Sequence, residues 1–79
     1  MVLAVATSSD IEAAIARYCA AHPHAADTAD GVRRIWLANP GLPLAAVEAA
    51  LEVLVTRGVL SVRRPVGSAV VYFIAGMRR

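Results

Sequence analysis

Arginine pairs are the residues of this sequence with the clearest chemical role. All eight basic residues are arginines, and six of them form the pairs Arg33-Arg34, Arg63-Arg64 and Arg78-Arg79. The planar guanidinium donates two parallel hydrogen bonds, and this geometry suits phosphate groups and the edges of bases. The pairs therefore predict contacts to a nucleic acid, with a general preference for arginine codons as the alternative.

A second group of residues has the types found in metal sites. Cys19, His22 and His24 follow one another closely, and Asp27 is near them in the sequence. Structural zinc sites generally use pairs of cysteines at tight spacing, however, whereas this chain has a single cysteine. We therefore expect one buried thiol at a helix end and two loop histidines, with no metal and no other cofactor. A metal site is the alternative.

No arrangement typical of catalysis is present. Ser8, Ser9 and Thr28 have no general base at a usable spacing, and they suit helix caps better than the role of nucleophile. Four carboxylates stand where helices are expected to begin, and the helix dipole accounts for them. They are Asp10, Glu12, Asp27 and Asp30. A glycine-rich phosphate loop is also missing. We therefore expect no catalytic residues and no enzymatic activity.

Length and composition indicate one small domain. The chain has 79 residues, of which 58% are hydrophobic and 18% charged, with a net charge of +2. The longest apolar runs, residues 1–6 and 69–75, are far shorter than the roughly 20 residues that cross a bilayer. A lone cysteine cannot form an intramolecular disulfide, which suits a reducing compartment. We expect a soluble, cytoplasmic protein without a membrane partner.

Within this single domain of residues 1–79, we distinguish an apolar segment at 1–8 and a basic tail at 76–79. Helical spacing of apolar residues from Ile11 to Cys19 predicts a first helix over residues 10–21. Ser9 and Glu12 match a capping box at its start, and Pro23 should stop it near His22.

A second helix is expected over residues 28–38, because Asp27 or Thr28 can cap it and Asn39-Pro40-Gly41 can end it. Asp30 favours its first turn. Its predicted buried face consists of Ala29, Val32, Ile35 and Trp36. We place Trp36, a large aromatic residue, in the core.

A third helix is expected to open at Pro43 and to end before Gly58, a residue suited to the position after a helix. Its predicted buried stripe is Leu44, Val47, Ala50, Leu51 and Leu54. The apolar period then changes from about 3.6 to 2, which predicts a strand beginning near Leu60. A turn at residues 65–68 and a second strand at 69–75 complete a hairpin.

Residues 42–74 resemble a winged helix-turn-helix domain of the bacterial transcription-regulator type. The resemblance rests on the apolar spacing of the third helix, on a basic residue and glycine at its end, and on the hairpin; these residues are Val47, Leu51, Leu54, Arg57-Gly58-Val59-Leu60 and Val71-Tyr72-Phe73-Ile74. With the two earlier helices it covers residues 9–75. It implies an α+β fold of three helices and a C-terminal β-hairpin wing, and a role in DNA binding and transcription regulation.

In that family the third helix lies in the major groove and the wing contacts backbone or minor groove. The groove-facing positions here would be Ala45, Ala46, Glu48, Ala49 and Glu52. Alanine can contact only a thymine methyl group, and a carboxylate repels phosphate. DNA would then be held through its phosphates, by Arg33, Arg34, Arg63, Arg64, Arg78 and Arg79. The alternative is a winged helix that binds a protein through the acidic, alanine-rich third helix and the apolar hairpin.

Two segments carry more apolar surface than a small core requires. Residues 69–75 are apolar on both faces of the expected strand, and residues 1–6 are apolar without belonging to the first helix. Such segments predict either a third strand of the sheet or an interface between subunits. We therefore expect a homodimer.

Overall fold

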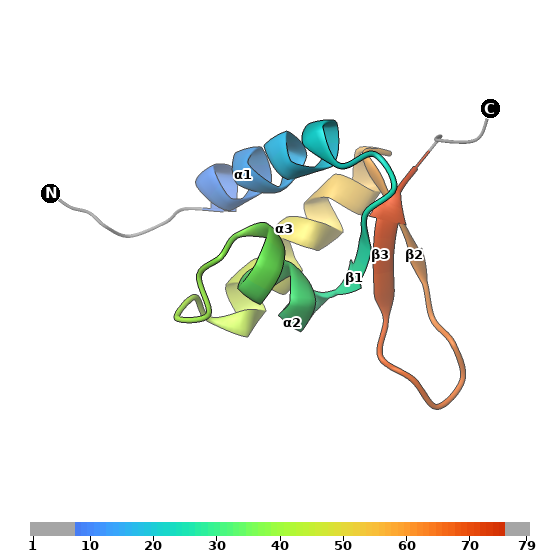
Figure 1. The fold of residues 1–79 in the computed structure, drawn as a ribbon. Helices are drawn as coiled ribbons and strands as arrows, with labels where there is room; N and C mark the ends of the chain where they lie inside the picture. Colours follow the sequence, from blue (N-terminus) through green and yellow to red (C-terminus); the bar gives the residue numbers. More distant parts are fainter. Residues whose placement is uncertain (1–7, 76–79) are drawn as a thin grey trace, which may run out of the picture.

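Three helical segments and a three-stranded antiparallel sheet make up the computed structural model, which describes residues 8–75 (Figure 1). The α+β class expected from the sequence is confirmed, and the arrangement is compatible with a winged helix. Along the chain the elements are α1 (Ser8–Ala21), β1 (Ala26–Thr28), α2 (Ala29–Gly31), η1 (Val32–Trp36), α3 (Leu44–Thr56), β2 (Leu60–Arg63) and β3 (Val71–Ile74).

The first helix, α1, buries the stripe that its periodicity predicts. Ile11, Ile15 and Cys19 are all part of the core. The helix begins at Ser8, so Ser9 lies within it and is not the capping residue that the sequence suggests. Glu12 forms an ion pair with Arg57, the residue that follows α3. The distance between Oε1 of Glu12 and Nη1 of Arg57 is 3.4 Å. This contact ties α1 to α3 at the surface.

The second helix changes its winding after one turn. Thr28 caps α2, because its Oγ1 accepts a hydrogen bond from the amide of Gly31 at 3.1 Å. The next residues form η1, a π-helix, in which the amide of Leu37 donates to the carbonyl of Val32, five residues earlier. The wider turn rotates Ile35 outward, so the prediction that Ile35 is buried is wrong; its exposed fraction is 61%.

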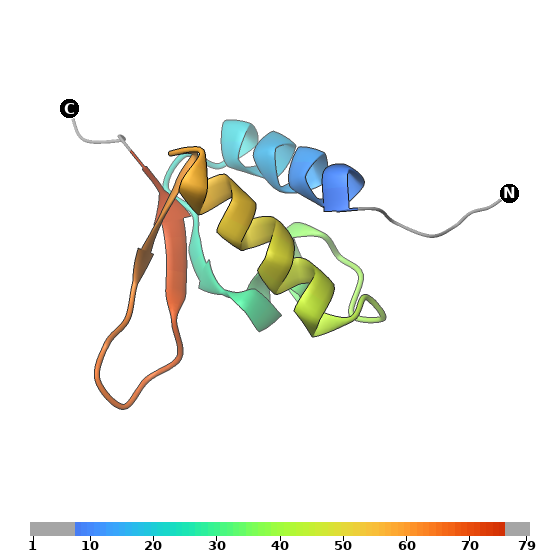
Figure 2. The same ribbon diagram turned by 180° about the vertical axis from the view of Figure 1, so that it is seen from behind.

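The third helix, α3, crosses the molecule with one long side uncovered, as the view from behind shows (Figure 2). Pro43 is its N-cap, so the helix begins at Leu44, one residue after the predicted opening at Pro43. At the other end the amide of Gly58 donates to Val55 and that of Val59 donates to Leu54, the pair of bonds of a Schellman motif. Gly58 has a φ of +81°, which explains why glycine stands there. None of the helices in residues 8–75 is long and apolar enough to cross a membrane.

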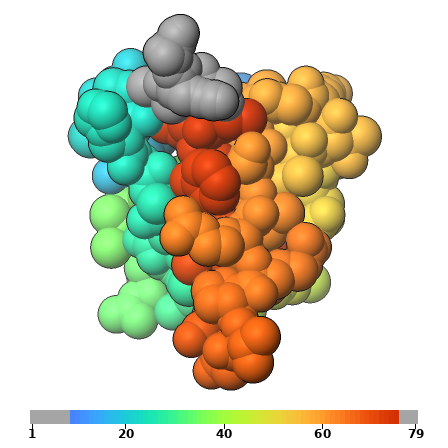
Figure 3. Space-filling view, turned by 90° about the vertical axis from the view of Figure 1, so that its right-hand side faces the viewer, coloured from blue at the N-terminus to red at the C-terminus, as the bar shows by residue number. Residues whose placement is uncertain are grey.

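The sheet has the strand order β1-β3-β2, with both pairings antiparallel. Figure 3 faces the outer side of this sheet, where β3 runs between the other two strands. The hairpin of β2 and β3 was expected from the sequence, whereas β1 falls in a segment that we expected to be loop and helix start. A segment of three residues that includes polar side chains is too short and too polar to predict a strand. It becomes β1 because it pairs with the edge of β3. Residues 1–6, the other possible third strand, lie outside the described residues.

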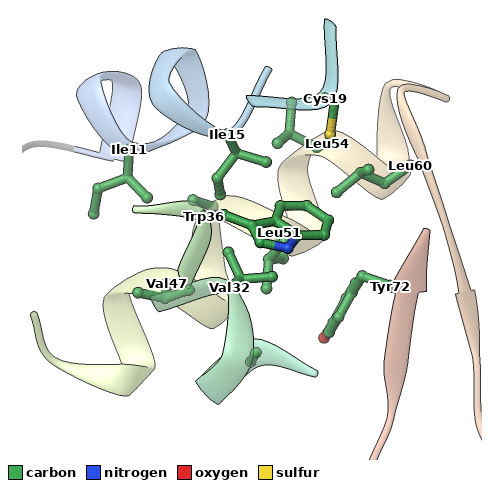
Figure 4. Close-up of a cluster of buried hydrophobic side chains, with 12 residues drawn as sticks. Ile11, Ile15, Cys19, Val32, Trp36, Val47, Leu51, Leu54, Leu60 and Tyr72 are labelled. Carbon is green, nitrogen blue, oxygen red and sulfur yellow. The ribbon is translucent and has the colours of Figure 1, made fainter. Parts of the chain in front are cut away.

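The core lies where α1, η1 and α3 meet the inner face of the sheet (Figure 4). Trp36 is buried, as expected, and its ring stacks on Tyr18 with 5.1 Å between centroids. The most completely buried side chains are Ile15, Val32, Val47, Leu51 and Leu60. Because these residues come from four elements, the position of every exposed surface depends on this one core.

Candidate binding surface

The uncovered side of α3 is acidic and lined with small residues. Ala45, Glu48, Ala49 and Glu52 are all exposed along it, as the resemblance implies for a groove-facing surface. Ala46 is the exception, since it is half-buried and packs against the core. The helix α3 therefore carries no basic side chain, and the first arginine after it is its C-cap, Arg57.

The two arginines of the second helix are engaged within the protein. Arg33 donates to the carboxylate of Asp30 and, through Nη1, to the carbonyl of Leu42 at 3.3 Å. Arg34 lies 3.4 Å from the same carboxylate. Hydrogen bonds and charge from the two guanidiniums lower the pKa of Asp30, with the Arg33 hydrogen bond as the largest cause. Both arginines thus have their charge partly neutralised, and Arg33 is only 23% exposed.

The arginines of the hairpin are placed differently. Arg63 lies on the outer face of the sheet, with its guanidinium 5.3 Å from the centroid of the Phe73 ring. Arg64 is exposed just beyond the end of β2. Neither forms an ion pair with a carboxylate of residues 8–75. The remaining predicted pair, Arg78-Arg79, lies outside the described residues.

A groove is formed by three parts of the chain. Its walls come from Asp30 of α2, from Leu44 and Glu48 of α3, and from the chain that enters β3. Two carboxylates therefore lie on the wall of the groove, whereas none of the arginines among residues 8–75 lines it. The charges of the described residues balance, because residues 8–75 hold six arginines and six carboxylates. The net charge of +2 comes from residues 78 and 79.

Tyr72 connects the sheet to the acidic side of α3. Its hydroxyl points from β3 toward the helices (Figure 4) and donates to Oε2 of Glu52 at 3.4 Å. Burial raises the pKa of the Tyr72 phenol, and the nearby charges of Glu52 and Glu48 raise it further. The phenol therefore stays protonated at neutral pH and lies next to two negative charges. Sequence reasoning missed the contact of this buried residue with Glu52, because it depends on packing between β3 and α3.

The possible metal ligands serve other roles in the structure. Cys19 is buried in the core, and burial raises the pKa of its thiol. His22 stacks on Tyr18 with 4.0 Å between centroids, and its Nδ1 lies 3.1 Å from the Tyr18 carbonyl. Among the described residues, no three side chains of the types His, Cys, Asp and Glu are grouped so that they could hold a metal ion.

Much of the apolar excess at residues 69–75 is used by the fold. Tyr72 is buried, and Val70 and Ile74 pack against the core. On the outer face, Phe73 is half-buried beneath Arg63. Self-association through this strand stays a prediction. The most exposed large apolar side chain among residues 8–75 is Val66 in the hairpin turn.

Comparison of the chain with protein-family models, with curated proteins and with solved structures finds no match.

Proposed function

We propose that the chain is a winged-helix domain that binds a partner protein through the exposed side of α3. The observation that carries this proposal is the composition of that side, where Glu48 and Glu52 alternate with exposed alanines and no basic side chain interrupts them. Two carboxylates at this position would repel the phosphates on both sides of a major groove. They suit a partner that presents basic side chains.

The order of the elements supports the winged-helix part of the proposal. Three helical segments precede a hairpin, a short strand follows the first helix, and this strand pairs with the last one. In this arrangement α3 occupies the place of the recognition helix, and the turn between β2 and β3 is the wing.

The small residues of α3 support a protein contact. The side chains of Ala45 and Ala49 are exposed and small, so the backbone of a partner element can approach α3 closely. The carboxylates beside them can accept charge-assisted hydrogen bonds, which are about twice as strong as neutral ones.

A photo-crosslinking experiment tests the proposal. Benzoylphenylalanine replaces Ala49 at the centre of the exposed side of α3, and in a matched control it replaces Ala13, an exposed alanine of α1. In the cells that make the protein, we expect the probe at position 49 to give a protein adduct and the probe at position 13 to give none. Combining the first probe with Glu48→Arg and Glu52→Arg should remove the adduct, while circular dichroism reports that the fold is kept. Adducts to DNA alone, or equal adducts from both positions, would contradict the proposal.

DNA binding through the wing is a second candidate, supported by the exposure of Arg63 and Arg64 and by the absence of ion pairs to them within residues 8–75. Such binding would rely on phosphate contacts, which position a protein without reading sequence. A regulatory role in transcription depends on this candidate.

Titration of a labelled random duplex at several salt concentrations tests the second candidate. The expected affinity falls with salt, and replacing Arg63 and Arg64 by alanine should make the log–log slope shallower by about two units. Absence of binding at low salt would leave the protein partner as the one function proposed for this fold.

A further inference from the structure

The groove between α3 and the start of β3 has the size of one long side chain. Its volume is about 260 Å³. Pockets for small organic ligands and cofactors generally have about 300–1,000 Å³, so this groove is too small for most of them. Leu44, Ala69 and Val70 form an apolar wall, and Tyr72 adds the edge of an aromatic ring.

The charge in the groove is concentrated on one residue. Asp30 lies on its wall, but this carboxylate is already paired with Arg33 and Arg34. Glu48 also lies on the wall, and it has no ion pair with an arginine of residues 8–75. None of the arginines among these residues lines the groove. The groove therefore offers one carboxylate that has no ion pair with an arginine of residues 8–75.

A second feature favours a positively charged occupant. Guanidinium and ammonium groups carry only donors, and each joins its charge to a long apolar stem. An apolar wall beside the carboxylate of Glu48 is complementary to such a side chain in both shape and charge.

We propose that this groove receives one arginine or lysine side chain of the partner protein, with the stem along Leu44 and Val70 and the charged end at Glu48. This inference rests on the proposed function and deepens it, because it states how α3 and the hairpin together recognise a basic partner. The exposed side of α3 would then provide the wider contact and the groove would provide the anchor.

Titration of the isotope-labelled chain with short blocked peptides, followed by NMR of the backbone amides, tests the inference. The probe is acetyl-Ala-Arg-Ala-amide, and the matched control is the same peptide with norleucine in place of arginine. The arginine peptide should shift the amides of Glu48, Ala69 and Val70, with a dissociation constant on the order of 1 mM, as befits one anchored side chain. The norleucine peptide should bind at least about tenfold more weakly, a difference of roughly 1.4 kcal/mol.

Two variants of α3 show whether the groove is the site. Glu48→Gln should weaken binding of the arginine peptide at least about tenfold, whereas Glu52→Gln, one turn further along the same exposed side, should change it less than about threefold. Glu52 does not line the groove, and glutamine keeps an acceptor for the Tyr72 hydroxyl. The amide spectra of both variants report directly whether they are folded.

Each outcome decides between the two proposals. Equal binding of the arginine and norleucine peptides, or equal loss in both variants, would overturn the basic anchor. If the crosslink at position 49 still forms while no peptide shifts the groove amides, the protein partner stands and the anchor falls. Sedimentation that shows a dimer of the full chain abolished by Glu48→Gln would identify a second copy as the occupant and overturn the separate partner.

Discussion

The guanidinium of Arg33 donates a hydrogen bond to the main-chain carbonyl of Leu42, 3.3 Å away. Because Arg33 also holds Asp30, it joins the second helix to the segment that leads into α3. The position of the acidic surface therefore depends on a residue that the sequence suggested for nucleic-acid binding.

Comparing Arg33→Ala with Arg34→Ala separates a structural arginine from an exposed one. Arg33→Ala leaves the Leu42 carbonyl without its side-chain donor, and loss of this bond alone should lower the free energy of unfolding by about 1 kcal/mol. Arg34 is 64% exposed, and its ion pair within residues 8–75 is with Asp30, so Arg34→Ala should be nearly neutral. Chemical denaturation of both variants checks this difference. Equal losses of stability would show that the Leu42 contact contributes little.

Gly31→Ala should destabilise the protein although Gly31 is helical. A Cβ on Gly31 would overlap the carboxylate of Asp27, so the carboxylate must move away from its hydrogen bond with the amide of Thr28. This clash should outweigh the roughly 0.5–1 kcal/mol that alanine contributes in a helix over glycine. Gly41→Ala is the matched control, because the nearest atom to its Cβ is 3.5 Å away. Thermal melting of the two variants measures the effect, and a Gly31→Ala variant that melts above the parent would contradict it.

Leu51→Ala should lower the free energy of unfolding by about 2–5 kcal/mol, because it opens a cavity in the centre of the core. Leu54→Ala should fall in the same range, since both side chains are buried. Leu44→Ala on the same helix is the control, and it should cost less than about 1 kcal/mol because Leu44 is 36% exposed. Urea unfolding provides the measurement. Similar losses at all three positions would mean that the buried side of α3 is assigned wrongly.

The raised pKa of Tyr72 predicts a loss of stability in alkali. Below pH 10, the phenol is protonated in both the folded and the unfolded chain, so its contribution is constant. Above pH 10 the phenol ionises in the unfolded chain first, which favours unfolding, and the stability that it contributes is lost as the pH rises through the folded pKa. Tyr72→Phe should therefore lose less stability than the parent between pH 9 and pH 11, as measured by denaturation at each pH. Parallel curves for the two proteins would show that the phenol is not perturbed.

Local patterns in the sequence determine much of this fold. The stripes of α1 and α3, the glycine after α3 and the hairpin follow from the spacing of apolar residues and from the turn chemistry of single residues. The prediction that Leu44 is buried is wrong, because this first residue of α3 is exposed. Trp36 could be placed in the core because a large aromatic side chain on a short helix has few other places to go. The acidic side of α3 was also foreseen, since the residues opposite a buried stripe must face the solvent.

Tertiary contacts decided the rest. The strand β1 forms only because β3 lies beside it, and Ile35 turns outward only because the helix widens after Gly31. The arginine pairs look alike in sequence, yet Arg33 and Arg34 are held by Asp30, whereas Arg63 and Arg64 on the hairpin form no ion pair with a carboxylate of residues 8–75. The groove joins residues more than twenty positions apart. Charge, burial and pairing at such places depend on which distant segments pack together, and a pattern within a short stretch of sequence does not contain that information.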